Sequence, residues 1–142
     1  MEKKIVYVDM DGVLADFQSA IETLPRETGP PDEVDGLFLD LDPLPDALES
    51  FSKLTEKYDV YILSTAPWGN PSAWCDKLHW VKKYLPELST KRLILSHNKH
   101  LNAGDYLIDD RLKNGAEKFT GELIHFGTDK YPDWKSVINY LM

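Results

Sequence analysis

The chain has 142 residues, a formal net charge of −8 and one cysteine, Cys75. This length predicts a single domain over residues 1–142. The acidic balance argues against a nucleic-acid polymer as a partner, because such a partner requires a basic face. A lone cysteine excludes an intrachain disulfide and favours a reducing, cytoplasmic setting. No apolar stretch reaches about 18 residues, so no membrane span is expected. The oligomeric state is unknown from the sequence.

Strand-like and helical segments alternate along the chain, which is the pattern of a parallel α/β sheet. In chain order, apolar runs predict strands over residues 5–8, 60–63, 92–95, 106–108 and 123–126. Apolar residues at helical spacing predict helices over residues 13–24, 46–58, 72–85 and 133–141. The helix over 72–85 is expected to bury the periodic residues Trp74, Leu78, Val81 and Leu85, and the core is expected to hold Trp74, Trp80 and Trp134. The fold class is therefore α/β, with a doubly wound, mostly parallel sheet.

Residues 28–46 interrupt this alternation, because they are rich in Pro, Gly and Asp. Apolar residues, among them Leu37 and Phe38, lie inside this stretch. We interpret residues of about 17–45 as a small cap insertion after the first strand.

Polar residues follow the predicted strands where each one ends. They are Asp9 and Asp11 after the first strand, Thr65 after the second, Lys99 just after the third, and Asp109 with Asp110 at the end of the fourth. In an open α/β sheet, ligands bind outside the carboxyl ends of the strands. Each signal has a structural alternative, since Asp-Gly is common in turns and an acidic pair can cap a helix. The order and spacing of all of them together favour a site.

These residue types in this pattern suit phosphoryl transfer. A carboxylate can attack phosphorus and divide one difficult step into two. A second carboxylate, two residues further on, can protonate the leaving oxygen and later activate water. Mg²⁺ prefers hard oxygen ligands, and a hydroxyl and an ammonium can hold the remaining phosphoryl oxygens.

The same motifs resemble those of the haloacid dehalogenase (HAD) superfamily of phosphatases, and within it the 5'(3')-deoxyribonucleotidase family. The matching stretches are residues 9–17, 43–49, 62–67, 80–85 and 105–111, together with Lys99. The resemblance implies a HAD-like, Rossmannoid fold and a nucleotidase that acts on nucleoside monophosphates through an aspartyl-phosphate.

The resemblance also implies catalytic and phosphate-binding roles. Asp9 would be the nucleophile and Asp11 the general acid and base. Thr65 and Lys99 would bind the phosphoryl group. The family often has Ser after its motif threonine, whereas this chain has Ala66, which leaves a backbone N–H as the available donor.

For the cofactor, the resemblance implies Mg²⁺ held by Asp9, by the backbone carbonyl of Asp11, and by the pair Asp109 and Asp110. We expect Asp110 to be the direct ligand and Asp109 to act through water. The adjacency of the two residues in the sequence leaves the opposite assignment open.

Apolar residues in and near the insertion are candidates for a substrate pocket. They are Phe17, Leu37, Phe38 and Trp68. Stacking on a base is one interpretation, and anchoring of the cap or loop onto the core is the other. The function predicted is a Mg²⁺-dependent 5'(3')-deoxyribonucleotidase. The alternatives are a HAD phosphatase for a sugar or amino-acid phosphate, and a receiver-like signalling domain, which the order of the acidic motifs disfavours.

Overall fold

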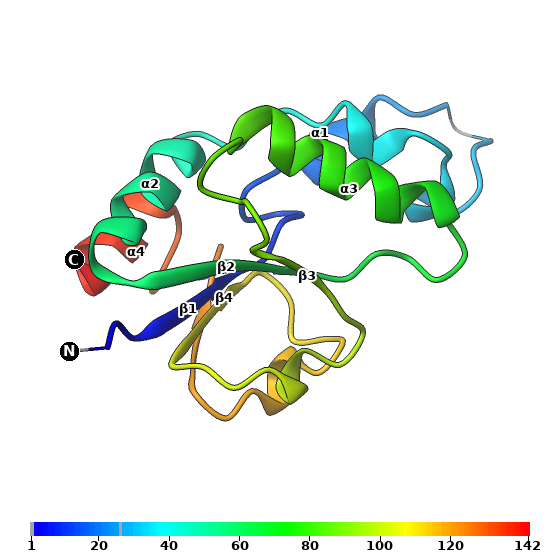
Figure 1. Ribbon diagram of the computed structural model, residues 1–142. Helices are drawn as coiled ribbons and strands as arrows, with labels where there is room; N and C mark the ends of the chain where they lie inside the picture. Colours follow the sequence, from blue (N-terminus) through cyan, green and yellow to red (C-terminus); the bar gives the residue numbers. More distant parts are fainter. Residues whose placement is uncertain (1, 26) are drawn as a thin grey trace.

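Five parallel strands form a single sheet in the order β3-β2-β1-β4-β5 (Figure 1). The computed structural model describes residues 2–25 and 27–142. The strands are β1 (Ile5–Val8), β2 (Asp59–Ser64), β3 (Leu93–Leu95), β4 (Tyr106–Asp109) and β5 (Glu122–His125). Each agrees with its predicted range to within one residue at either end. From β1, the chain adds β2 and then β3 on one side of the sheet. It then crosses to the other side of β1 and adds β4 and β5, so the strand order reverses between β1 and β4. The predicted doubly wound α/β fold is confirmed.

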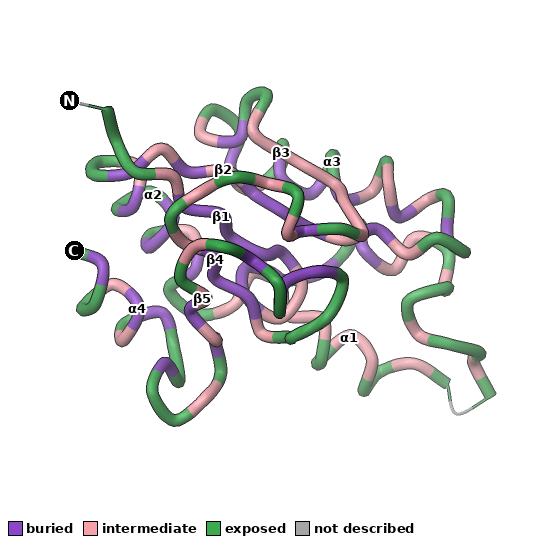
Figure 2. Tube along the Cα trace, turned by 90° about the horizontal axis from the view of Figure 1, so that it is seen from below, coloured by how far each residue is buried: buried purple, intermediate pink, exposed green. Residues whose placement is uncertain are grey.

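Apolar side chains of the strands divide between the two faces of the sheet. Val6 and Val8 of β1 belong to the large core, whereas Tyr7 belongs to a second, smaller core on the opposite face. This alternation follows from the two-residue period of a strand. The helices cover the face of the large core, and Figure 2 shows the central strands buried. The short 3₁₀ turns η3 (Lys99–Leu101) and η4 (Ala116–Lys118) lie on the other side of the sheet (Figure 1).

Four α-helices occur in the described residues: α1 (Phe17–Glu22), α2 (Ala47–Lys57), α3 (Pro71–Tyr84) and α4 (Trp134–Leu141). The last three agree with the predicted helices to within one residue. In the part of the chain that the structure describes, no helix is both long and apolar enough to cross a membrane.

The predicted helix over residues 13–24 is wrong in its first part. Gly12 has a φ of +78°, and the N–H groups of residues 13, 14 and 15 all donate to the carbonyl of Met10. This tight turn keeps the segment out of helical register. The helix begins only at Phe17, where the side chain of Asp16 caps it by accepting a hydrogen bond from the N–H of Ser19 at 3.1 Å.

The predicted buried face of α3 is also partly wrong. Leu78 is 41% exposed and Trp74 is only half-buried. The residues of α3 that are buried are Ala73, Lys77, Trp80 and Val81. Lys77 therefore takes a buried position on this helix, whereas the predicted buried face named only apolar residues.

The segment between α1 and α2 packs against α3. It contains two further 3₁₀ turns, η1 (Pro31–Glu33) and η2 (Leu37–Leu39), and Phe38 of η2 is 1% exposed. The side-chain amide of Asn70, just before α3, donates to the carbonyls of Asp32 and Val34 at 3.0 and 3.1 Å. These bonds hold the segment beside the carboxyl ends of the strands. Its status as a cap on a single domain stays a prediction.

Candidate active site

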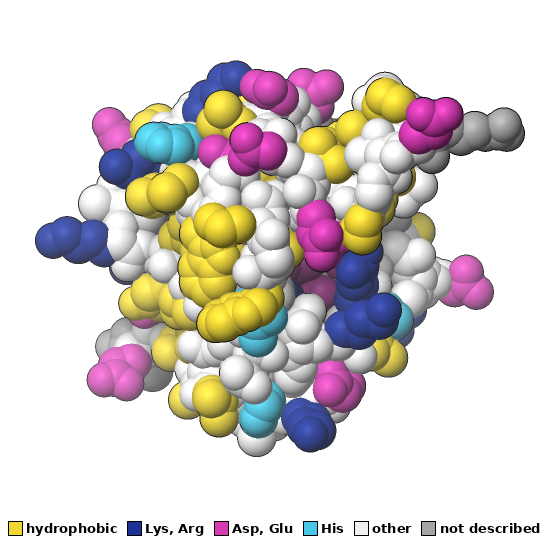
Figure 3. Space-filling view, turned by 90° about the vertical axis from the view of Figure 1, so that its right-hand side faces the viewer, with side chains coloured by type: hydrophobic (Ala, Val, Ile, Leu, Met, Phe, Trp, Pro, Cys, Tyr) yellow, Lys and Arg dark blue, Asp and Glu magenta, His cyan; other side chains and the backbone are white. Residues whose placement is uncertain are grey.

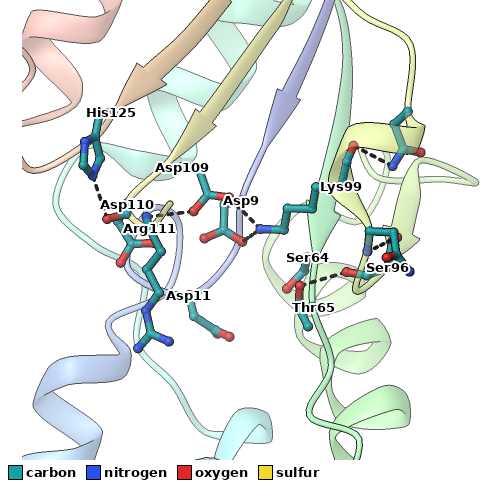
Figure 4. A network of polar contacts seen from close by, with 12 residues as sticks. Asp9, Asp11, Ser64, Thr65, Ser96, Lys99, Asp109, Asp110, Arg111 and His125 are labelled. Atoms are coloured by element: carbon teal, nitrogen blue, oxygen red, sulfur yellow. Dashed lines mark hydrogen bonds and ion pairs between the residues drawn. The ribbon is translucent and has the colours of Figure 1, made fainter. Parts of the chain in front are cut away.

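Three of the predicted acids meet Lys99 at the carboxyl edge of the sheet, namely Asp9, Asp109 and Asp110. Asp9 follows β1, Asp109 ends β4 and Lys99 begins η3 after β3. Because β1 and β4 are neighbouring parallel strands, their final residues reach the same edge. Figure 4 shows the side chains of Asp9 and Asp109 turned toward the lysine.

Lys99 joins two acids that lie far apart in the sequence. Its Nζ is 3.0 Å from Oδ1 of Asp9 and 2.7 Å from Oδ2 of Asp109. The lysine is 4% exposed, and Asp9 is 6% exposed. A buried ammonium is costly unless it is paired, and two carboxylates meet that requirement here.

Burial also changes the proton affinity of these groups. Loss of hydration raises the pKa of Asp9 to about 7; the charges of Asp109 and Asp11 add to the rise, and Lys99 opposes it. Burial and the neighbouring Asp9 carboxylate raise the pKa of Asp110 to about 7 as well. For Lys99, burial acts to lower the pKa, but the two carboxylates outweigh it and the pKa is raised. The edge thus carries more negative charge than one lysine neutralises, and a cation would relieve this.

The donor set fits a hard divalent metal ion. Asp9, Asp109 and Asp110 each offer an oxygen, and these oxygens all lie within 4.8 Å of one another. Oδ1 of Asp110 is buried without a hydrogen-bond partner among the described residues. Both oxygens of Asp109 are engaged, since Oδ2 accepts from Lys99 and Oδ1 accepts from the N–H of Arg111 at 3.0 Å. Carboxylate oxygens are the ligands that Mg²⁺ prefers.

Gly12 is required for the close approach of the two acidic motifs. A Cβ at this position would lie 2.1 Å from Oδ2 of Asp110. The positive φ of Gly12 also favours glycine. The Asp-Met-Asp-Gly sequence therefore supplies both the acids and the space in which Asp110 approaches them.

Asp11 lies apart from the Lys99 cluster and has a different partner. Figure 4 shows its carboxylate pointing away from Asp9. Its Oδ2 accepts a hydrogen bond from Nζ of Lys77 at 2.6 Å. Sequence reasoning missed this lysine. Its position four residues before Val81 and three before Trp80, both buried, was the available signal.

Thr65, the polar residue after β2, also lies at the carboxyl edge of the sheet. Thr65 lines the pocket, and its hydroxyl donates to the carbonyl of Ser96 at 2.8 Å (Figure 4). This bond orients the hydroxyl and leaves its oxygen lone pairs for another donor. Ala66, next in the chain, is fully buried.

A cavity of about 350 Å³ opens above these residues. Phe17, Phe38 and Trp68 line it, whereas Leu37 packs against the large core instead. The rings of Phe17 and Phe38 are stacked, with centroids 5.4 Å apart, and Trp68 is 84% exposed. Figure 3 shows a hollow on this face in which acidic and basic side chains meet beside a hydrophobic patch.

Two basic residues of the pocket wall were also missed from the sequence. Arg111 and Lys113 follow the acidic pair at the end of β4, are exposed, and line the cavity. Their position directly after Asp109 and Asp110 was the available signal. They bring positive charge to an otherwise acidic pocket, which suits an anionic ligand.

Solved structures show the class of fold. A Bacillus subtilis protein described as a "putative HAD-hydrolase", bound to magnesium, matches with a TM-score of 0.67 and 11% identity over 99% of each chain. A class C acid phosphatase from Bacillus anthracis, with tungstate bound, matches with a TM-score of 0.62 and 14% identity, over 100% of this chain and 74% of its own. At such low identity, the likeness shows the fold alone, which is that of HAD hydrolases.

Sequence relatives narrow this class to a family. The family model described as 5' nucleotidase, deoxy (pyrimidine), cytosolic type C protein matches residues 33–134. A "Putative 5'(3')-deoxyribonucleotidase" of Vibrio phage KVP40 is 54% identical over 99% of this chain and 85% of its own. One of the same description from Staphylococcus aureus strain Mu50 is 30% identical over 100% of this chain and 97% of its own. The chain belongs to this 5'-nucleotidase family of HAD hydrolases and is a phosphoric monoester hydrolase, so the resemblance seen in its motifs is confirmed.

Proposed function

We propose that this chain is a Mg²⁺-dependent 5'(3')-deoxyribonucleotidase that removes phosphate from nucleoside monophosphates through an aspartyl-phosphate on Asp9. The observation that carries this proposal is the buried arrangement of Asp9, Lys99 and Asp109, with the unpartnered oxygen of Asp110 beside it. A buried cluster with raised pKa values, set in a pocket, is typical of a reaction centre.

In the first step, a carboxylate oxygen of Asp9 bonds to phosphorus, and the ester bond breaks with its electron pair on the leaving oxygen. Asp11 donates a proton to that oxygen from Oδ1, the carboxyl oxygen that Lys77 does not hold. In the second step, Asp11 takes a proton from water, the water oxygen bonds to phosphorus, and the bond to Asp9 breaks. Inorganic phosphate leaves, and both aspartates return to their starting states. The nucleophile and the proton donor must be two acids with separate partners. The pairing of Asp9 with one lysine and of Asp11 with another supports these two roles.

Asp9 and Asp110 would hold the magnesium ion directly, with Asp109 acting through water. This assignment is supported because both oxygens of Asp109 already accept hydrogen bonds, whereas Oδ1 of Asp110 accepts none from the described residues. The bound ion would supply positive charge to the phosphoryl oxygens. Lys99 and the N–H of Ala66 would bind the same group, and the hydroxyl of Thr65 would do so once its proton turns from the Ser96 carbonyl to a phosphoryl oxygen.

The substrate class follows from the relatives and the pocket wall. Relatives across the whole chain are described as 5'(3')-deoxyribonucleotidases. Phe17 and Trp68 offer aromatic surface at the cavity, and Arg111 and Lys113 offer charge. A ligand with one anionic end and one planar apolar end fits this combination.

A panel of phosphate esters tests the proposal. Phosphate release is measured with Mg²⁺ for deoxynucleoside, ribonucleoside and sugar monophosphates, each at saturating and limiting concentration. We expect the highest kcat/KM for deoxynucleoside monophosphates. A higher kcat/KM for sugar phosphates would replace the nucleotidase with a small-metabolite phosphatase, and turnover that survives full chelation would refute the metal-dependent mechanism.

A further inference from the structure

Lys77 is a fully buried lysine in the middle of α3, and none of the steps above uses it. Among the described residues that line the pocket, Lys77 is absent, so its ammonium does not contact a ligand there. A lysine side chain is rarely buried unless its ammonium is fully paired. The contacts of this ammonium therefore need an explanation.

The ammonium of Lys77 makes two hydrogen bonds and lies over one aromatic ring. Nζ lies 2.6 Å from Oδ2 of Asp11 and 2.8 Å from Oγ of Ser64, at the end of β2. It also lies 4.6 Å from the ring centroid of Phe38, in the insertion. An ammonium over an aromatic face is attracted by the ring. The lysine is thus fixed from three sides by the sheet, by the turn after β1 and by the insertion.

The carboxylate of Asp11 depends on this one lysine for its orientation. Oδ2 is held by Lys77, and Oδ1 has no hydrogen-bond partner in the part of the chain that the structure describes. Asp9 and Asp109 are held differently from Asp11. They share Lys99, and Asp109 also accepts a hydrogen bond from the backbone N–H of Arg111. Without Lys77, the Asp11 side chain would be free to rotate.

We propose that Lys77 is a positioning residue that holds Asp11 in place for proton transfer to the leaving oxygen. The proposal rests on the function proposed above. It requires that Lys77 act through Asp11 alone, and not through the phosphoryl group or through general stability. A lost proton donor matters most when the leaving oxygen is a poor leaving group, because such an oxygen cannot depart without the proton.

Two substrates with different leaving groups distinguish an effect through Asp11 from an effect through the phosphoryl group or through general stability. A nucleoside 5'-monophosphate expels an alcohol oxygen, whereas p-nitrophenyl phosphate expels a stable phenolate that needs no proton. The quantity compared is kcat/KM, because it reports the steps up to cleavage of the ester bond and excludes hydrolysis of the aspartyl-phosphate. For Lys77→Met, we expect kcat/KM to fall by about 10²-fold on the nucleotide. On p-nitrophenyl phosphate, we expect a loss at least about tenfold smaller.

Two further variants test whether the effect passes through Asp11. Lys82→Met changes an exposed lysine on the same helix and should leave both rates unchanged. In an Asp11→Asn background, Lys77→Met should cause little further loss on the nucleotide, since residues that act as a unit are not additive. Equal losses on both substrates, or full additivity with Asp11→Asn, would overturn the proposal.

Thermal unfolding accompanies every variant, because a buried lysine also affects stability. If Lys77→Met does not fold, Ser64→Ala takes its place, since it removes the second hydrogen-bond partner of Lys77 and leaves Asp11 untouched. The ratio of the two kcat/KM values should then shift in the same direction, by a smaller factor, and an unchanged ratio contradicts the proposal. If the wild-type protein hydrolyses neither substrate, the proposed function itself fails. If it hydrolyses both and the ratio never moves, only the assignment of Lys77 fails.

Discussion

The carboxyl edge of the sheet differs from the aromatic wall of the pocket in how the side chains are held. The insertion and the loop after β2 form this wall. At the edge, Asp9 and Asp109 are buried and share an ammonium at 3.0 and 2.7 Å. In the wall, Phe17 is half-buried, and Trp68, from the loop after β2, is 84% exposed. Chemistry requires atoms held within fractions of an ångström, whereas recognition of a planar group tolerates looser contacts. The contrast supports the proposal that the edge performs the reaction and the wall selects the substrate.

Asp9→Asn should cause the largest change, because it removes the attacking oxygen from the edge. We expect kcat to fall by more than about 10³-fold on every phosphate ester, with the fold retained. Steady-state phosphate release with Mg²⁺ and circular dichroism check both parts. Asp40→Asn, an exposed aspartate in the insertion, is the matched control. Substantial turnover by Asp9→Asn would contradict the role of Asp9 as nucleophile.

Phe38→Ala should act mainly on stability, although Phe38 lies in the wall. The ring is 1% exposed, stacks on Phe17 and covers the ammonium of Lys77. Loss of a fully buried phenylalanine costs about 3–5 kcal/mol of unfolding free energy, which chemical denaturation measures. If stability is unchanged and the KM for nucleotides rises while that for p-nitrophenyl phosphate does not, Phe38 belongs to the substrate site and not to the core.

The charge at the edge predicts a pH-dependent stability in the absence of metal. The pKa of Asp9 and of Asp110 rises from 3.8 to about 7 on folding, chiefly through burial. Between these values the folded protein retains protons that the unfolded chain has lost, so the unfolding free energy decreases as pH rises from about 4 to 7. With a chelator present, the thermal midpoint should be lower at pH 8 than at pH 5.

Magnesium should restore part of the unfolding free energy that is lost as pH rises. Because the acids are ionised at pH 8, the increase in thermal midpoint on adding Mg²⁺ should be larger at pH 8 than at pH 5. Asp110→Asn removes one of the two groups and should weaken both trends. A midpoint that does not depend on Mg²⁺ at either pH would contradict a metal site at this edge.

Phe17→Ala should produce the smallest of these effects. The effect should be confined to recognition of the substrate's base. Phe17 begins α1, lines the cavity and is only half-buried. Loss of one stacking surface raises KM for a nucleoside monophosphate by about tenfold. The KM for a small alkyl phosphate, which has no ring, should not change. Equal changes for both substrates would mean that Phe17 shapes the cavity without contacting a base.

Local signals in the sequence determined much of the fold and indicated the proposed reaction centre. Apolar runs located the five strands, and acids at the ends of two of them indicated the proposed reaction centre. The fold prediction is confirmed, and the predicted acids lie close together because parallel strands bring their carboxyl ends to one edge, whatever the loops between them do. The order of Asp9, Thr65, Lys99 and the acidic pair was enough to indicate phosphoryl transfer.

Only the tertiary structure decided features that depend on contacts between distant segments. The tight turn at Met10 shortened the first helix, and packing of the insertion against α3 buried Lys77 in place of Leu78. A lysine on an amphipathic helix predicts solvent exposure unless its partners are known, and here they come from β2, from the turn after β1 and from the insertion. The sequence by itself indicated the groups proposed to perform the reaction, whereas the tertiary structure decided what holds Asp11, because that contact joins residues 66 positions apart.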